Sequence, residues 1–294
     1  MVTGSLEGEY IEFDMMRADI ERFVSVVSGP DEDINLAEAA LLIAKMAYPE
    51  LDMDLYLRRL DEMAVAVGTH LREDDSLVRT MAELNRYLFE EQGFAGNLEN
   101  FFDPRNSFLN DVIERKLGIP ISLSVIYLEV GQRLGLPLVG VSFPGHFLVK
   151  LRLESGEIVL DPFSGGLSLG KADLEQRLNK LVDEERSFDV DLEHLLNAAS
   201  KKEILVRMLR NLKSIYASHG NLNRVLTVAN YILLIVPDAA EEVRDRGQIY
   251  DKMDCFKAAY SDYRHYLHLQ PEADDAANIW ARCVELRQAI AKLI

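Results

Sequence analysis

The sequence predicts an α+β protein with a helical N-terminal region, a core that contains a small antiparallel sheet, and an all-α C-terminal segment. Two observations carry this prediction. Apolar residues recur at helical spacing through roughly the first hundred residues, and they then alternate with polar residues between positions 138 and 161. Towards the C-terminus, a helical pattern repeats with a period of 34 residues.

The N-terminal helices are predicted from apolar residues that return every three or four positions. They span about Ile34 to Tyr48, Met53 to Val67 and Leu77 to Phe89. A further helix is predicted from Ser107 to Leu117. The next one, from Ile121 to Leu134, is apolar on most sides, which is typical of a helix at the centre of a fold.

Alternation of apolar and polar residues predicts three strands, at about 138–141, 147–153 and 158–160. The second and third form a hairpin, with His146 opening the first strand of the hairpin and Asp161 closing the other. Side chains on one strand point alternately to the two faces, so this pattern predicts that His146 and Asp161 share the face opposite to the apolar residues. Arg152 and Glu157 are predicted to form a cross-strand ion pair beside the turn.

Charge is distributed unevenly and predicts two folding units. Residues 1–195 carry 18 Lys and Arg against 37 Asp and Glu, a net charge of −19, whereas residues 196–294 carry 14 against 12, a net charge of +2. We therefore predict a domain over 1–195, with its core at about 97–182, and a second domain over 196–294. The total charge of −17 argues against nucleic acid as a partner, because phosphate binding needs a basic face.

The 34-residue period of the C-terminal segment is that of tetratricopeptide repeats. Positions that this motif reserves for aromatic and helix-ending residues recur at that spacing, as Tyr216 with Tyr250 and Pro237 with Pro271. Two repeats are predicted in this way. A last helix, from about Asp274 to Leu293, is predicted to cap them, with Trp280 and Leu286 facing inward.

Other features of the sequence predict a cytoplasmic protein without a membrane anchor. The start of the chain lacks a basic segment followed by an apolar run, so no secretory signal is expected. The longest apolar run, near Tyr231 to Val236, is too short to span a bilayer. Cys255 and Cys283 lack metal-ligand spacing, so no metal and no cofactor are predicted. The oligomeric state is left open.

The candidate catalytic residues are Ser122, His146 and Asp161. A histidine beside an aspartate on a neighbouring strand is the arrangement of an oriented base, although either residue could also be purely structural. A nucleophile would belong at the start of the buried helix, where the helix dipole favours a thiolate. No cysteine stands there. Ser122 is the nearest candidate, and an N-cap role is the alternative for it.

Residues 97–166 resemble the transglutaminase-like domain of a bacterial family that joins this domain to C-terminal tetratricopeptide repeats. Members of this family have historically been labelled regulators of invasion-gene expression. The segments that carry the resemblance are Gly96-Asn97, Asn106-Ser107, Leu109-Asn110, Glu114-Arg115, Gly118-Ile-Pro-Ile-Ser-Leu-Ser124, Leu134-Gly-Leu-Pro137, Pro144-Gly-His-Phe-Leu148 and Leu160-Asp-Pro-Phe163.

The resemblance implies a papain-like core in which His146 and Asp161 occupy the His and Asp positions of the transglutaminase triad. The position of the family's catalytic cysteine falls near Pro120 when counted without gaps, or at Ser122 when one small gap is allowed. Neither residue is a cysteine. The chain therefore departs from the catalytic pattern at its nucleophile.

Two functions follow from these observations. The first, which we favour, is a non-catalytic or regulatory pseudoenzyme that binds protein or peptide partners through the cleft and the repeats. The alternative is a hydrolase or acyltransferase with a Ser122-His146-Asp161 triad. A Ser122 hydroxyl within hydrogen-bond reach of the His146 ring would favour the alternative.

Overall fold

The computed structural model describes residues 17–180 and 192–292. The chain divides into two compact units, with the first ending at Met208 and the second beginning at Leu209. This division falls inside helix α9 (Lys201–Ser218), whereas the boundary expected from charge, after residue 195, precedes that helix. The expected end of the core at residue 182 lies outside the described residues.

The first unit is mostly helical. Its α-helices are α2 (Leu36–Lys45), α3 (Met53–Gly68), α4 (Leu77–Asn85), α5 (Leu109–Arg115), α6 (Pro120–Arg133), α7 (Lys171–Asn179) and α8 (Leu192–Leu195), and residues 17–27 are also helical. Shorter turns are η1 (Asp31–Asp33), the π-helical turn η2 (Arg86–Glu91), η3 (Pro104–Asn106) and η4 (Pro162–Ser164). Helices α2, α3 and α4 begin where a side chain accepts a backbone N–H, namely at Asn35, Asp52 and Ser76.

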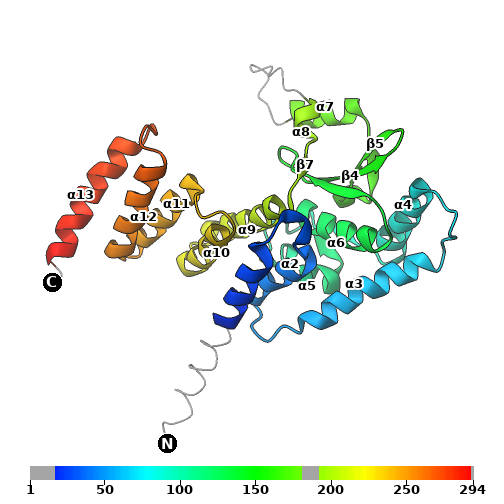
Figure 1. The fold of residues 1–294 in the computed structure, drawn as a ribbon, viewed down its shortest axis with the longest axis horizontal. Helices are drawn as coiled ribbons and strands as arrows, with labels where there is room; N and C mark the ends of the chain where they lie inside the picture. Colours follow the sequence, from blue (N-terminus) through cyan, green and yellow to red (C-terminus); the bar gives the residue numbers. More distant parts are fainter. Residues whose placement is uncertain (1–16, 181–191, 293–294) are drawn as a thin grey trace, which may run out of the picture. The chain divides into compact units, whose positions relative to one another are not determined.

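Helix α6 is the centre of the first unit. All of its residues from Pro120 to Gly131 are buried, as its apolar sequence predicts. Gly131 allows β3 to approach closely, because a Cβ atom there would collide with the side chain of Leu138. Figure 1 shows the sheet between α6 on one side and α7 on the other.

The sheet has five antiparallel strands in the order β6-β5-β4-β3-β7. They are β3 (Leu138–Val141), β4 (Leu148–Leu153), β5 (Gly156–Asp161), β6 (Leu167–Leu169) and β7 (Ala198–Ala199). Two further short strands, β1 (Ala95–Gly96) and β2 (Leu117–Gly118), pair in parallel. The predicted hairpin is therefore present, although His146 lies in the turn before β4 and not in the strand itself.

The predicted ion pair of the hairpin is wrong. Arg152 and Glu157 do lie opposite each other, but the Glu157 carboxylate pairs with the Lys150 ammonium at 2.9 Å. Lys150 precedes Arg152 by two residues in β4 and therefore lies on the same face of the sheet. Its side chain is buried, and its ammonium also donates to the Leu196 carbonyl. A buried ammonium needs a carboxylate more than the solvated Arg152 does.

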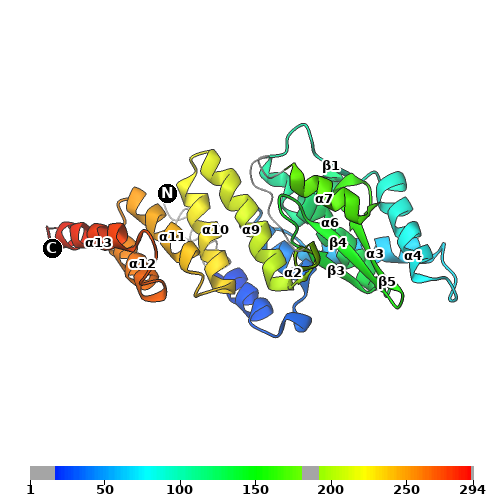
Figure 2. The ribbon, with the colours of Figure 1, turned by 90° about the horizontal axis from the view of Figure 1, so that it is seen from above.

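The second unit is built from helical pairs, which Figure 2 shows from above. Helices α10 (Leu222–Ile235), α11 (Ala240–Lys252), α12 (Phe256–Leu269) and α13 (Ala276–Lys292) follow α9. Pro237 and Pro271 come just after α10 and α12, where the repeat pattern placed helix ends. Gly247 lets α12 approach α11, because a Cβ atom there would lie 2.9 Å from the Tyr263 ring.

The last helix differs from its predicted orientation. Leu286 is buried, as predicted, but Trp280 is 54% exposed, so its predicted inward position is wrong. Ile279 and Cys283 occupy the inner face instead. In a helix Ile279 lies about 100° and Cys283 about 60° to the same side of Trp280, and this rotation leaves the indole outside the core. Leu293, the predicted end of the helix, lies outside the described residues.

None of the helices within residues 17–180 and 192–292 is long and apolar enough to cross a membrane.

Candidate functional site

The structure brings His146 and Asp161 together. The Nε2 atom of His146 lies 2.8 Å from the Oδ1 atom of Asp161, within the distance of a hydrogen bond. Asp161 is the last residue of β5, and its side chain is completely buried. Because the carboxylate accepts the Nε2 proton, neutral His146 carries its basic lone pair on Nδ1. The predicted proximity of the two residues is present.

The Asp161 carboxylate has several further partners. Oδ1 accepts the backbone N–H of Phe163, and Oδ2 accepts the Ser164 hydroxyl at 2.7 Å and pairs with the Arg177 guanidinium at 2.7 Å. Burial would raise the pKa of this carboxyl, but the hydrogen bonds from His146, Ser164 and Arg177 outweigh burial and lower the pKa to about 2. Asp161 is therefore a fixed anion that orients His146.

The loop that carries His146 is held by Arg207 of helix α9. Its guanidinium donates to the His146 carbonyl at 2.7 Å, to the Phe143 carbonyl and to the Ser142 hydroxyl. It also lies over the Phe147 ring, 5.8 Å from the ring centroid. Burial lowers the pKa of Arg207. This single residue therefore fixes both ends of the turn before β4.

Ser122 is placed differently from His146 and Asp161. It is the third residue of α6, not the N-cap, which is Ile119. Its hydroxyl accepts the Ile119 N–H at 3.0 Å and donates to the Asn106 carbonyl at 2.6 Å. The side chain is fully buried. The role of Ser122 in these contacts is to tie the start of the helix to the loop before α5.

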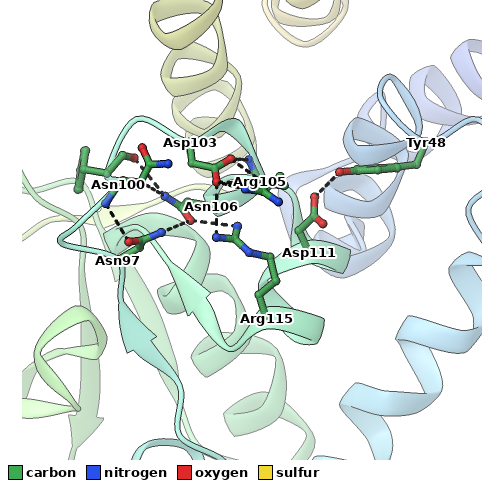
Figure 3. A network of polar contacts seen from close by, with 9 residues as sticks. Tyr48, Asn97, Asn100, Asp103, Arg105, Asn106, Asp111 and Arg115 are labelled. Atoms are coloured by element: carbon green, nitrogen blue, oxygen red, sulfur yellow. Dashed lines mark hydrogen bonds and ion pairs between the residues drawn. The ribbon is translucent and has the colours of Figure 1, made fainter.

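Asn106 is the centre of the polar network in Figure 3. Its Oδ1 atom accepts Nδ2 of Asn97 at 3.0 Å and the Arg115 guanidinium at 3.2 Å. Its Nδ2 atom donates to the carbonyls of Asn100 at 2.7 Å and Phe101 at 3.3 Å. Asn106 is fully buried, so this one amide fixes the path of the loop over residues 97–103.

That loop presents a row of aromatic rings beside His146. The rings of His146 and Phe163 meet edge to face at 5.8 Å between centroids, Phe163 meets Phe101 at 6.3 Å, and Phe101 meets Phe102 at 5.5 Å. Phe163 packs directly on Gly96, where a Cβ atom would collide with the ring. Phe102 is 64% exposed, and Leu98 from the same loop is 79% exposed. We call Phe101, Phe102 and Phe163 the aromatic row.

The site therefore contains two of the three candidate residues. His146 and Asp161 are joined, whereas the hydrogen bonds of Ser122 go to backbone atoms of Ile119 and Asn106. Arg177 and Arg207 were missed by sequence reasoning. Each is an arginine of an amphipathic helix that meets its partner only through the tertiary fold, and no local pattern marks it. Among the described residues, no cluster of His, Cys, Asp and Glu could hold a metal ion.

Comparisons with known proteins identify both units. Residues 54–210 match the model of the transglutaminase-like superfamily, and residues 212–283 match a tetratricopeptide-repeat model. A UPF0162 protein of Xylella fastidiosa (strain 9a5c) is 42% identical over 262 residues, which cover 89% of this chain and 93% of that protein. A UPF0162 protein of Vibrio cholerae is 34% identical, covering 85% and 92%. Protein SirB1 of Salmonella typhimurium is 28% identical, covering 74% and 78%.

Proposed function

Because this chain belongs to the transglutaminase-like superfamily and continues into tetratricopeptide repeats, we propose that it is a non-catalytic, regulatory protein that binds protein or peptide partners. Tetratricopeptide repeats generally mediate protein–protein interactions through the surfaces of their stacked helices. The proposal depends on two features of the first unit. One is the state of the candidate nucleophile, and the other is the aromatic row beside His146.

The state of Ser122 is the observation that carries the proposal. A serine nucleophile must give its proton to a base, and here the Ser122 proton is donated to the Asn106 carbonyl at 2.6 Å. The hydroxyl is also fully buried, so an acyl group could reach it only after the helix start had moved. His146 pairs with Asp161, and within the described part of the chain no hydrogen bond joins the His146 ring to a serine or cysteine side chain. Such a pair supports recognition of a ligand through Nδ1 of His146.

The alternative function, a hydrolase or acyltransferase with a Ser122-His146-Asp161 triad, makes a clear chemical prediction. An active serine would react with a fluorophosphonate probe and lose this reaction in a His146→Ala variant. We expect no labelling of Ser122 in the native protein. Mass spectrometry of the intact chain and its peptides checks this result, and His146-dependent labelling of Ser122 would contradict the proposal.

Replacing Ser122 with alanine tests its structural role. We expect the free energy of unfolding to fall by about 1–3 kcal/mol, because the buried N–H of Ile119 and carbonyl of Asn106 each lose a partner. Urea denaturation measures the change. Binding of partners should persist in the folded fraction. If the protein had hydrolase or acyltransferase activity, and the variant lost this activity at unchanged stability, Ser122 would instead be a catalytic serine.

The aromatic row supplies the surface for partner binding. Exposed aromatic side chains gathered in one place are typical of interfaces rather than of plain solvent-exposed loops. Asn106 holds the loop backbone at Asn100 and Phe101, so ordering this backbone costs little conformational entropy when a partner docks. We infer a partner segment that offers apolar or aromatic side chains to the row and a hydrogen-bond donor to His146.

A peptide selected from a random library on the immobilised full chain provides a probe for this surface. We expect Phe102→Asp to weaken binding of the selected peptide by about tenfold or more, because a charge would be placed in an apolar contact. Val65→Asp is the matched control, since Val65 is similarly exposed, at 68%, on helix α3. Fluorescence anisotropy measures both. Equal loss in the two variants, or no loss in Phe102→Asp, would contradict the assignment of the surface.

A further inference from the structure

Helix α13 has apolar side chains on two faces. Its inner face, with Ile279, Cys283 and Leu286, packs in the core of the second unit. Its outer face carries Trp280, which is 54% exposed, and Val284, which is 46% exposed. These two residues are four positions apart and therefore neighbours on the helix surface. The exposed alanines of the same face continue the stripe, at Ala277, Ala281 and Ala291.

This stripe stays exposed among the described residues. In a stack of repeats each helical pair covers an apolar face of its neighbour, so an exposed apolar face on α13 is available to a partner. Here the Arg264 guanidinium lies 5.6 Å from the centroid of the Trp280 ring and covers part of it. The remaining exposed indole and the Val284 side chain form the kind of centre at which interfaces concentrate their binding energy.

Charged residues at the two ends of α13 indicate which partner binds the apolar stripe around Trp280 and Val284. Glu272 and Asp274 come just before the helix, and Arg287 and Lys292 lie in its second half. All four are exposed, and none of them forms an ion pair within the described part of the chain. The helix therefore has an acidic N-terminal end and a basic C-terminal end, with the apolar residues between them.

We propose that two copies of this protein associate through α13, with the two helices antiparallel and Trp280 and Val284 at the centre. An antiparallel pair places the acidic end of each helix beside the basic end of the other, so the same patch complements itself, as a two-fold interface requires. The opposed helix dipoles also favour this direction. The proposal is independent of the binding function assigned to the aromatic row.

The size of the interface sets the expected affinity. Helix α13 has 17 residues, which corresponds to a length of about 25 Å. A single helix pair of this length buries less than the roughly 800 Å² per partner of a standard interface. We therefore expect a reversible dimer with a dissociation constant in the micromolar range, at about 1–100 μM.

Sedimentation velocity of the full chain over a concentration series measures this equilibrium. We expect a monomer that converts to a dimer as concentration rises. The fluorescence of Trp280, the single tryptophan of the chain, should shift to shorter wavelength over the same range because the indole leaves water. Trp280→Ser and Val284→Glu should each weaken dimerisation about tenfold or more. Val65→Glu, at an exposed apolar position of the first unit, should leave it unchanged.

Two charge-reversed chains test the orientation. The variant Arg287→Glu/Lys292→Glu makes both ends of α13 acidic, and the variant Glu272→Lys/Asp274→Lys makes both ends basic. Each alone should dimerise more weakly than the wild type, and an equimolar mixture of the two should dimerise again, because opposite charges then meet at both ends. Circular dichroism verifies that the variants are folded.

Three results would overturn the proposal. A chain that stays monomeric throughout the concentration series excludes self-association, including the case in which the stripe binds a different protein. A dimer that is insensitive to Trp280→Ser and Val284→Glu uses another surface. Charge-reversed chains that each dimerise as strongly as the wild type contradict the antiparallel arrangement, and a mixture that dimerises no better than either chain alone shows that the charged ends do not meet.

Discussion

Replacing Asp161 with asparagine is expected to lower the free energy of unfolding at pH 7 by about 3 kcal/mol or more. The carboxylate is fully buried and bonds the His146 ring and the Arg177 guanidinium. An asparagine would leave the Arg177 guanidinium without its counter-charge. Its NH₂ group would also stand where a carboxylate oxygen now accepts a hydrogen bond from the His146 ring or from the Ser164 hydroxyl. Urea denaturation followed by circular dichroism measures the loss.

The same residue predicts how stability depends on pH. Folding lowers the pKa of Asp161 from 3.8 to about 2, so its contribution is complete above pH 4 and is lost as the pH falls towards 2. The difference corresponds to roughly 2 kcal/mol. Wild-type stability should therefore fall more steeply between pH 4 and pH 2 than the stability of Asp161→Asn. Parallel curves for the two proteins in this window would contradict the low pKa.

A matched control separates this effect from the general loss of a negative charge. Asp74 is exposed, and within the described part of the chain its side chain forms no hydrogen bond or ion pair. Asp74→Asn should change the free energy of unfolding by no more than about 0.5 kcal/mol. Its free energy of unfolding should also fall between pH 4 and pH 2 as steeply as that of the wild type.

The second large effect is expected for Asn106→Ala. The amide of Asn106 serves four hydrogen bonds, to the buried amide of Asn97, to the half-buried Arg115 and to two carbonyls of the loop backbone, and its removal breaks all four. At about 1 kcal/mol for each lost hydrogen bond, we expect a loss of roughly 3–4 kcal/mol. We also expect faster proteolysis within residues 97–103, because these bonds hold that loop. Denaturation and limited proteolysis with mass spectrometry measure the two effects.

Asn100→Ala is the control for Asn106→Ala. Asn100 lies in the same network, but its described bonds use its backbone N–H and carbonyl, which an alanine retains. Its stability should stay within about 0.5 kcal/mol of the wild type. If Asn106→Ala proved as stable as Asn100→Ala, the buried amide of Asn106 would not be what fixes the loop over residues 97–103. The proposal that this loop holds the aromatic row in place would then also be wrong.

The class of fold and the order of its elements could be read from the sequence because they follow from local periodicity. Helices α3 and α6 begin and end within a residue or two of their predicted limits. Strand alternation placed His146 and Asp161 on one face, and the observed register of β4 against β5 agrees with that placement. Both patterns depend only on which side chains face the core, so each is recorded in a short stretch of chain.

What the tertiary structure alone decided is the identity of partners that come from distant segments. Arg177 and Arg207 reach the site from helices whose own pattern is merely amphipathic. The Ser122 hydroxyl bonds the Asn106 carbonyl, not His146, because the loop before α5 runs past the start of α6. Trp280 faces water because Ile279 and Cys283 fill the inner face of α13. Such contacts depend on how elements pack, and a sequence pattern limits but does not specify the packing.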